Sequence, residues 1–356
     1  AKYSLTYGLP ELRETIEQKL AEDEMYYDFE KEIIATVGSI EAITATFISV
    51  IDDKRNEIIL FSPSYTSFQE AVKVAGGKPV FVNLIENEGW RIDFKSLAKK
   101  IGPRTAAILV NNPNNPTGTI FSKEDLLTIA AMIEKTKAFI IIDEVYKDFI
   151  YYDYKKPATT EAEIVESVLN LEKATDEPYA KQKFFSLAQI PQLRKKVIRI
   201  FSLSKAYAMT GWRIGFLHSD EENVSEILKV HDSLVTCAPV ISQYAAIAAL
   251  DYGDEEVERF RLEYQKRRDL ICNHLDDLSD YISYQRPNSS YFVFPKTLTS
   301  KDSWQFARDL LAKAKVAVVP GLAYGPSGEG HIRLSFGRNE KDINEAMKRI
   351  KNYFKS

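Results

Sequence analysis

Short apolar runs alternate with amphipathic stretches from Glu32 to about Ser219. Seven of the apolar runs show no apolar–polar alternation and are rich in Val, Ile and Phe, which is typical of strands buried on both faces of a mainly parallel sheet. These predicted strands are Glu32–Thr36, Glu57–Phe61, Val80–Asn83, Thr105–Asn111, Phe139–Ile142, Val197–Phe201 and Ile214–His218.

Helical patterns separate these strands. In Lys123–Lys135, for example, Ser122 can serve as the N-cap and Asp125 lies in the first turn. Strands that alternate with helices predict a three-layer α/β domain, here with a mainly parallel seven-stranded sheet. Ligands of such domains bind at the carboxyl ends of the strands.

The rest of the chain predicts a different arrangement. Residues 223–278 are mostly helical and include one long connecting helix, Glu255–Leu275. We therefore divide the chain into a large domain at 1–222, connecting helices at 223–278 and a smaller α+β domain at 279–356. The small domain is expected to contain β-like runs at Ser290–Pro295, Val316–Val319 and His331–Phe336, and helices at Ser303–Lys313 and Glu340–Tyr353. Tyr154–Lys183, with a helical middle at Glu161–Leu171, reads as a polar insertion in the large domain.

Composition narrows the functional classes. The 47 basic and 51 acidic residues give a net charge of −4, which argues against a nucleic-acid-binding protein. Cys237 and Cys272 form no disulfide framework or zinc-binding pattern, so we expect a reducing, cytoplasmic location and no metal site. The apolar run Tyr244–Leu250 is far shorter than the roughly twenty residues of a membrane helix, and no signal peptide is visible.

The segment Phe201–Gly215 contains the most informative chemistry. Lys205 directly follows a buried strand, with serines before it and Arg213 eight residues later. Partial desolvation at a strand end lowers the pKa of a lysine and makes its amine a nucleophile that can form a Schiff base. Taken alone, the segment fits better a lysine that merely extends its amine to solvent at the strand edge.

Three other strand ends carry polar residues. Asp143 ends a buried strand. A carboxylate there either pairs with a cation, such as a protonated pyridine nitrogen, or serves as the cap of the next helix. Asn111–Gly118 is either an ordinary tight turn or a rigid element that fixes the Asn115 amide, with Asn115–Pro116 as a candidate cis bond. Thr36–Ala42 joins a strand to a helix, and the free N–H groups there either bind phosphate or belong to an ordinary capped turn.

Together and in this order, the four segments resemble the class I/II aminotransferases, which are fold-type I enzymes using pyridoxal 5′-phosphate. The resemblance extends from Tyr3–Arg13 to Val318–Gly321 and His331–Ser335. It implies a transaminase that moves an amino group from an L-amino acid to a 2-oxo acid by a ping-pong mechanism. It also implies a homodimer with shared active sites.

The resemblance assigns the catalytic roles. Lys205 corresponds to the lysine that joins the cofactor and moves the substrate α-proton. Asp143 corresponds to the partner of the pyridine nitrogen, and Asn115 and Tyr146 to the donors to the ring oxygen. Arg333 corresponds to the residue that takes the substrate α-carboxylate in two parallel hydrogen bonds, and Asn115 is expected to contact the substrate as well.

The remaining cofactor contacts follow from the same resemblance. Tyr65 corresponds to the aromatic residue that stacks on the cofactor ring, and Tyr3 to a tyrosine that reaches the phosphate of the neighbouring subunit. A dianionic phosphate gains strong hydrogen bonds from a guanidinium and helix N–H groups. The expected phosphate-binding set is Ser39, the backbone of Ile40, Ser202 and Arg213.

Departures from the family pattern bear on the substrate. Enzymes that act on aspartate need a second cation, but Ile40 replaces the lysine of one subgroup and Thr236–Pro239 lacks the arginine of another. We therefore expect a donor with an uncharged or aromatic side chain rather than a dedicated aspartate enzyme. The N-terminal arm that the family usually places near the substrate is expected to be absent from the residues given.

Two alternatives stay open. A C–S lyase or decarboxylase can use the same fold, although such lyases tend to carry His after the Asp-Glu pair, where Val145 and Tyr146 stand here. An aminotransferase-like regulator that senses a ligand would need an N-terminal DNA-binding segment, and none is visible.

Overall fold

The computed structural model describes residues 2–151 and 184–355. The predicted insertion Tyr154–Lys183 and its helical middle lie outside the described residues. Within them, none of the helices combines the length and the apolar character that crossing a bilayer requires.

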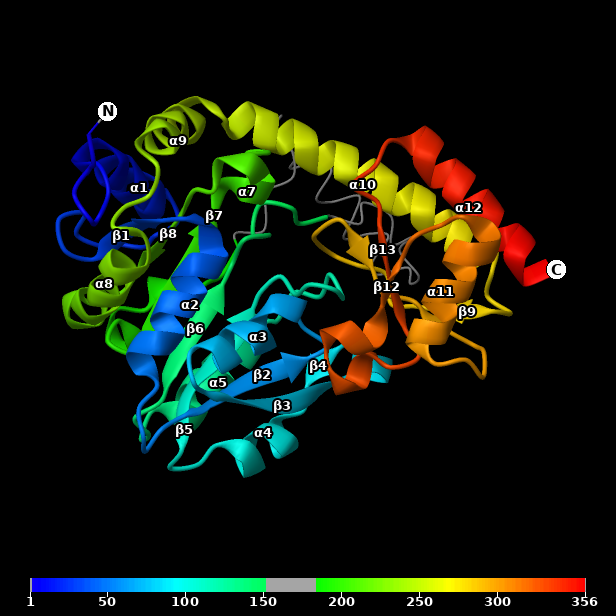
Figure 1. Cartoon of the computed structure of the whole chain (residues 1–356), viewed down its shortest axis with the longest axis horizontal. Coiled ribbons are helices and arrows are strands. Elements are labelled where there is room, and N and C mark those ends of the chain that lie inside the picture. Colours follow the sequence, from blue (N-terminus) through cyan, green and yellow to red (C-terminus); the bar gives the residue numbers. More distant parts are fainter. Residues whose placement is uncertain (1, 152–183, 356) are drawn as a thin grey trace, which may run out of the picture.

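A twisted sheet forms the centre of the structure (Figure 1). Its order is β1-β8-β7-β6-β5-β2-β3-β4; β8 is antiparallel to both neighbours, β4 is antiparallel to β3, and the other pairs are parallel. All seven predicted strands are present. The expected count omitted the two-residue β4, which is too short to give a periodic signal. The bounds are β1 Ile33–Thr36, β2 Glu57–Ser62, β3 Lys78–Ile85, β4 Arg91–Ile92, β5 Thr105–Asn111, β6 Phe139–Asp143, β7 Val197–Ser202 and β8 Gly215–His218.

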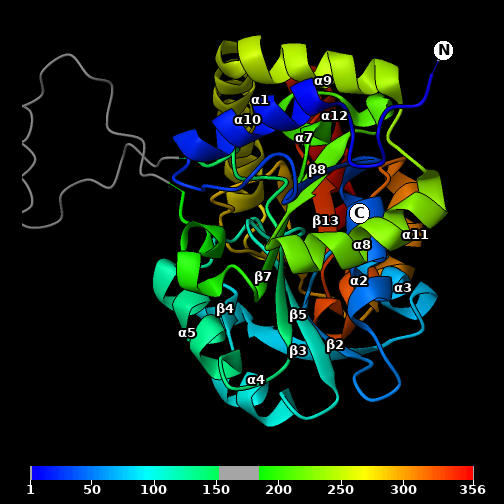
Figure 2. The ribbon, with the colours of Figure 1, turned by 90° about the vertical axis from the view of Figure 1, so that its left-hand side faces the viewer.

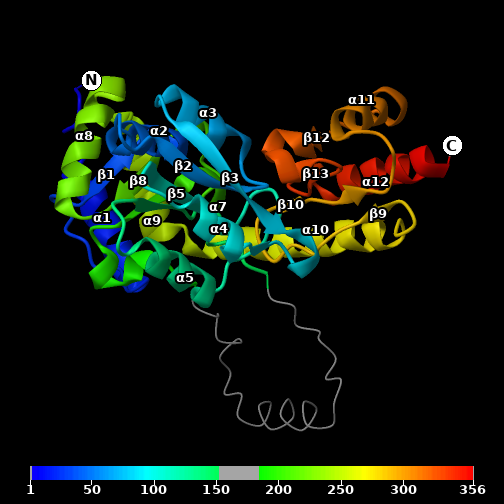
Figure 3. The ribbon, with the colours of Figure 1, turned by 90° about the horizontal axis from the view of Figure 1, so that it is seen from below.

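Helices cover both faces of the sheet and make three layers (Figure 3). Along β2, Ile58 packs into one core and Ile59 into the other, because successive side chains of a strand point to opposite faces. One face is covered by α2 (Gly38–Val50), α3 (Thr66–Val74) and α8 (Glu221–Val235), and the other by α1 (Pro10–Glu22), α4 (Phe94–Lys100), α5 (Lys123–Ile133) and α9 (Val240–Tyr252). Two 3-10 turns, Leu187–Gln189 and Pro191–Leu193, precede β7.

The start of α5 agrees with the sequence. The hydroxyl of Ser122 accepts a hydrogen bond from the Asp125 backbone N–H, and the Asp125 carboxylate accepts one from the Ser122 N–H. This reciprocal capping satisfies two helix-start donors that would otherwise lack partners.

The predicted connecting helix is α10 (Asp254–Asp276), which runs from α9 to the C-terminal elements (Figures 1 and 2). Those elements surround a separate core that includes Phe306, Phe336 and Met347. The predicted strand at 316–319 begins later, at Val319. The C-terminal elements are β9 (Ile282–Ser283), β10 (Phe292–Val293), β11 (Lys296–Thr297), α11 (Ser303–Ala314), β12 (Val319–Pro320), β13 (Ile332–Ser335) and α12 (Glu340–Lys355).

Candidate active site

A cavity of about 440 Å³ opens where the carboxyl ends of β5, β6 and β7 meet the strands β10 and β13. Ten of the eleven predicted site residues line it; Tyr3 does not. Those ten are Ser39, Ile40, Tyr65, Asn115, Asp143, Tyr146, Ser202, Lys205, Arg213 and Arg333. Among the described residues, no group of three or more His, Cys, Asp or Glu side chains is placed to hold a metal ion.

Lys205 lies on α7 (Leu203–Ala206), a single helical turn that directly follows β7. Ser202 is the N-cap of this turn, and its hydroxyl accepts a hydrogen bond from the Ser204 backbone N–H at 3.2 Å. The abrupt change from strand to helix presents Lys205 to the cavity, where its Nζ lies 5.7 Å from the centre of the Tyr291 ring. The position suits a nucleophilic amine that meets a ligand held over the strand ends.

Asp143 ends β6 and is 4% exposed. Its Oδ1 accepts a hydrogen bond from the backbone N–H of Val145 at 3.3 Å. Burial raises the pKa of this carboxyl to about 7, although the Val145 hydrogen bond and the charges of Lys205 and Arg199 act in the opposite direction. The site thus contains a buried acid that a ligand cation would stabilise as the anion.

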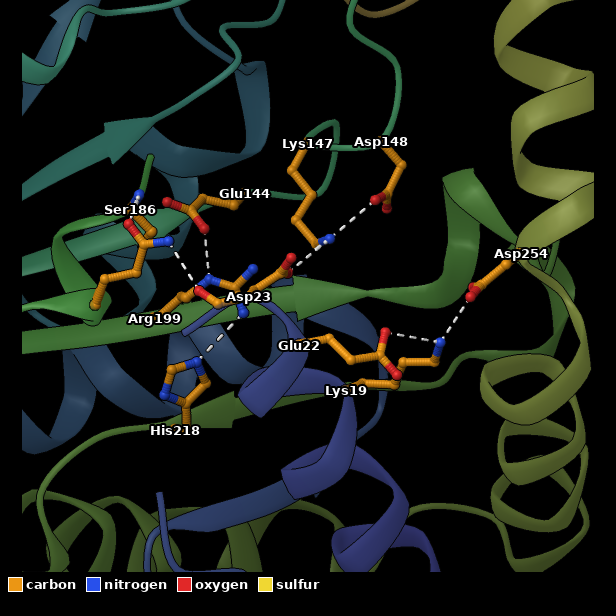
Figure 4. Close-up of polar contacts among 11 residues, drawn as sticks. Lys19, Glu22, Asp23, Glu144, Lys147, Asp148, Ser186, Arg199, His218 and Asp254 are labelled. Carbon is orange, nitrogen blue, oxygen red and sulfur yellow. Dashed lines mark hydrogen bonds and ion pairs between the residues drawn. The ribbon is translucent and has the colours of Figure 1, made fainter. Parts of the chain in front are cut away.

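The residue after Asp143, Glu144, takes part in a buried ion pair (Figure 4). Glu144 pairs with Arg199 from β7, and Nη1 of Arg199 lies 3.3 Å from Nε2 of His218 on β8. Burial, reinforced by Arg199, holds the pKa of His218 well below its ordinary value, so the imidazole is neutral. Arg199 therefore offsets the negative charge that Glu144 places next to Asp143.

An anion site forms at the start of α2. Val37, the N-cap, makes no side-chain capping bond, so the N–H groups of Ser39 and Ile40 remain available at the positive end of the helix dipole. The guanidinium of Arg213 packs against Gly38, where an added Cβ would lie 2.5 Å from Nη2. Helix N–H groups beside a guanidinium and serine hydroxyls are a combination that binds phosphate.

A rigid turn places Asn115 in the cavity. The side chain of Asn111 accepts a hydrogen bond from the Asn115 backbone N–H at 2.8 Å, and the buried Asn114 accepts one from the Thr117 hydroxyl at 2.9 Å. The Asn115–Pro116 bond is cis, as predicted. The turn is therefore a fixed element and not a loose loop.

Arg333 lies on β13 at the opposite wall of the cavity. Its Nη1 donates to Oδ1 of Asn115 at 3.1 Å, and its guanidinium lies 4.0 Å from the centre of the Phe292 ring. Nε of Arg333 is buried and has no hydrogen-bond partner among the described residues. The free donor and the planar fork suit a carboxylate ligand.

The sequence comparison identifies the family. A profile described as aminotransferase class I and II matches residues 1–350. The chain belongs to this aminotransferase family. It is 33% identical over 355 residues to an aspartate aminotransferase of Pyrococcus abyssi, covering 98% of this chain and 82% of that protein. It is 32% identical over 357 residues to aromatic-amino-acid aminotransferase 2 of Thermococcus litoralis, covering 99% and 84%.

Solved structures agree with this assignment. The crystal structure of an aromatic aminotransferase from Pyrococcus horikoshii superimposes with a TM-score of 0.87 at 31% identity, covering 99% of this chain and 88% of that one. The protein is therefore a pyridoxal 5′-phosphate-dependent aminotransferase with the fold that the sequence predicted.

The cavity of this aminotransferase fits its cofactor. The amine of Lys205 suits the aldehyde, and the anion site at the start of α2 suits the phosphate. The raised pKa of Asp143 shows that this carboxyl lacks a sufficient counter-charge, which a protonated pyridine nitrogen would supply. The aldehyde, the phosphate and the pyridine nitrogen of pyridoxal phosphate thus each have a chemically matched group on the cavity wall.

Sequence analysis missed several residues of the aminotransferase cavity. Tyr291 and Phe292 reach it from β10 and its approach, a segment whose apolar character gave only a strand prediction. The others follow or flank predicted positions and could have been proposed from their neighbours: Asn111, Val145, Ser204, Thr210 and Ser335. Tyr3 is 84% exposed, and its predicted contact with a neighbouring subunit stays a prediction.

Proposed function

We propose that Lys205 both carries the cofactor and moves the proton of the substrate. The observation that supports this role is that the Lys205 amine, the buried Asp143 carboxylate and the anion site at the start of α2 all line one cavity. Nζ of Lys205 would hold the bound cofactor covalently and would become a free amine when an amino acid binds. The freed amine then takes the proton from Cα of the amino acid, and later returns a proton to Cα of the second substrate.

Three further residues set the electronic state of the site. The bound cofactor supplies a ring that accepts the negative charge developing at the substrate Cα. Asp143 as an anion holds the pyridine nitrogen protonated. Burial raises the pKa of Tyr146 well above its usual value, so its phenol stays a donor for the ring oxygen. Asn115 accepts from Arg333 through Oδ1, which leaves its Nδ2 free to donate to the same oxygen.

Separate residues of the cavity would hold the cofactor phosphate, the cofactor ring and the substrate carboxylate. Backbone N–H groups of Ser39 and Ile40, with Ser202 and Arg213, would bind the phosphate, and Tyr65 would cover the ring. At the other wall, the Arg333 guanidinium binds the α-carboxylate shared by the amino acid and the 2-oxo acid. Both half-reactions therefore use one carboxylate site.

We propose a donor whose side chain is uncharged or aromatic. Among the described residues that line the cavity, the cations are Lys205, Arg213 and Arg333, and each already has a role. Ile40 adds an apolar group to the wall, so a side-chain carboxylate would be buried without a partner. The relatives include both aspartate and aromatic enzymes, so sequence identity alone does not choose the donor.

L-Aspartate should be a poor donor compared with L-phenylalanine or L-leucine. We expect kcat/KM for aspartate, with 2-oxoglutarate as acceptor, to be at least about tenfold lower, because an unpaired buried charge costs more than 1.4 kcal/mol. Ile40→Lys should narrow this difference by supplying a cation, and Ile40→Leu is its size-matched control. A preference of the wild-type enzyme for aspartate would refute the proposal.

We propose a homodimer that uses the exposed face of α9. Ile241, Tyr244 and Tyr252 lie on one side of this helix and are 74%, 58% and 83% exposed, which is an unusual apolar stripe for a free surface. The side chain of Gln243 accepts from the Leu9 N–H at 2.6 Å and donates to the Ser4 hydroxyl at 3.0 Å. These contacts hold the segment that carries Tyr3 beside the same helix, where Tyr3 can reach the phosphate of a partner subunit.

Tyr244→Glu should disrupt this dimer and weaken cofactor binding at the same time. A charge in the centre of an apolar interface is costly, and loss of the interface would remove Tyr3 of the partner subunit from the phosphate. Sedimentation velocity and cofactor titration would measure the two effects. Leu298→Glu, which alters another exposed apolar residue, should change neither. A dimeric Tyr244→Glu variant would exclude this face as the interface.

The cellular location of the protein and the division of its chain into domains remain proposals. We propose a cytoplasmic enzyme, because Cys237 and Cys272 are free thiols in the structure. We also propose that residues 1–222 form the cofactor domain and 279–356 the small domain, joined by the helices of 223–278. The separate core around Phe306 supports this division.

A further inference from the structure

The strand that carries Arg333 is anchored to the large sheet just before it begins. His331 precedes β13, and its Nε2 lies 3.1 Å from Oε1 of Glu86, in the turn that follows β3. Its Nδ1 lies 3.0 Å from the carbonyl oxygen of Glu329. The ring of His331 is thus placed between the turn after β3 and the backbone just before β13.

The surroundings of His331 fix its position. The side chain is 2% exposed, its ring stacks on Phe294 with 4.9 Å between the centres, and Trp90 packs edge-on at 5.3 Å. Nζ of Lys296 also reaches Glu86, at 3.3 Å. The proximity of His331, reinforced by Lys296, holds the pKa of Glu86 below its ordinary value, so this carboxylate is ionised near neutral pH.

Arg333 follows His331 by two residues. In an extended chain, residues two apart project from the same face, so a displacement of His331 is passed directly to Arg333. Other contacts tie the segment before β13 to β2: Ser64 N–H donates to the Tyr324 carbonyl at 2.9 Å, and the Ser327 hydroxyl donates to that of Ser62 at 2.8 Å. Of these three contacts, the Glu86–His331 pair lies nearest to Arg333 along the chain.

We propose that Glu86 and His331 are positioning residues for Arg333. Their contact joins the turn after β3 to the residue just before β13. It thereby fixes the Arg333 guanidinium in the position where it can bind a carboxylate in the cavity. The inference rests on the proposed role of Arg333 and adds that the carboxylate site is set from outside the cavity, through a contact that no substrate touches.

Glu86→Gln should raise KM for the amino acid and for the 2-oxo acid by the same factor, about three- to tenfold, with kcat unchanged. The equal effect is expected because both substrates use the carboxylate site, and kcat is spared because that contact is the same in the bound substrate and the transition state. The absorption spectrum of the bound cofactor should not change. Glu88→Gln, which alters an exposed acid in the same turn, should have no effect.

Steady-state kinetics of both half-reactions would decide between the outcomes. Unchanged KM values in Glu86→Gln, or a lowered melting temperature as the only effect, would overturn the positioning role. So would a rise in KM for one substrate alone. Arg333→Gln separates the two proposals: if it raises both KM values while Glu86→Gln does not, only this inference fails, and if it raises neither, the proposed role of Arg333 fails as well.

Discussion

Replacing Lys205 with alanine should reduce amino transfer by more than about 10⁴-fold. The variant loses both the covalent link to the cofactor and the only amine placed to move the α-proton among the described residues that line the cavity. The cavity itself should survive, because α7 is capped through Ser202 and does not depend on the Lys205 side chain. Cofactor should therefore still bind at the anion site, with lower affinity.

Borohydride reduction followed by mass spectrometry of the intact protein measures this loss directly. The wild-type protein should retain one cofactor per chain after denaturation, and Lys205→Ala should retain none. Lys195→Ala, which removes an exposed lysine, is the matched control and should behave as wild type. Covalent cofactor in the Lys205→Ala variant would show that another lysine forms the link.

Asp143→Asn should separate catalysis from stability. Without an anion beside the pyridine nitrogen, turnover should fall at least about a hundredfold. The cofactor-free protein, by contrast, should become more stable above neutral pH. The pKa of Asp143 is raised from 3.8 to about 7 by burial, so the folded state binds a proton more tightly than the unfolded state, and stability falls as pH rises from about 4 to 7.

An asparagine at position 143 cannot ionise, so the fall in stability between about pH 4 and pH 7 is absent in this variant. At pH 8 we expect cofactor-free Asp143→Asn to exceed the wild type in free energy of unfolding by about 1 to 4 kcal/mol, and the gain should vanish near pH 4. Urea unfolding at the two pH values would measure it. Asp53→Asn, which alters an exposed acid, should show no such pH-dependent difference. A variant that is less stable than the wild type at pH 8 would contradict the assigned ionisation.

The sequence alone was sufficient to predict the site residues that lie at the ends of the parallel strands. Asp143 and Lys205 lie far apart in the chain, yet both follow buried parallel strands, and such strands end at one edge of a sheet. Arg333 and Tyr65 were located only through the family resemblance, because a single charge on a short strand carries no positional signal.

Other features depend on tertiary packing. The two-residue β4 has no periodicity to detect, and Tyr291 reaches Lys205 only because β10 pairs with β13. The contact of His331 with Glu86 joins residues more than two hundred positions apart, and no local pattern indicates it. Apart from β4, the features that the sequence missed are thus created by contacts of the C-terminal elements with one another or with the large sheet.

The central claim is that the enzyme transfers an amino group in two separate half-reactions. It is tested most directly by mixing cofactor-loaded protein with an L-amino acid in the absence of any 2-oxo acid. The absorption of the cofactor should change once, with one equivalent of 2-oxo acid formed per active site, and return when 2-oxoglutarate is added. Continuous release of ammonia, sulfide or carbon dioxide, or no spectral change with any amino acid, would contradict the account.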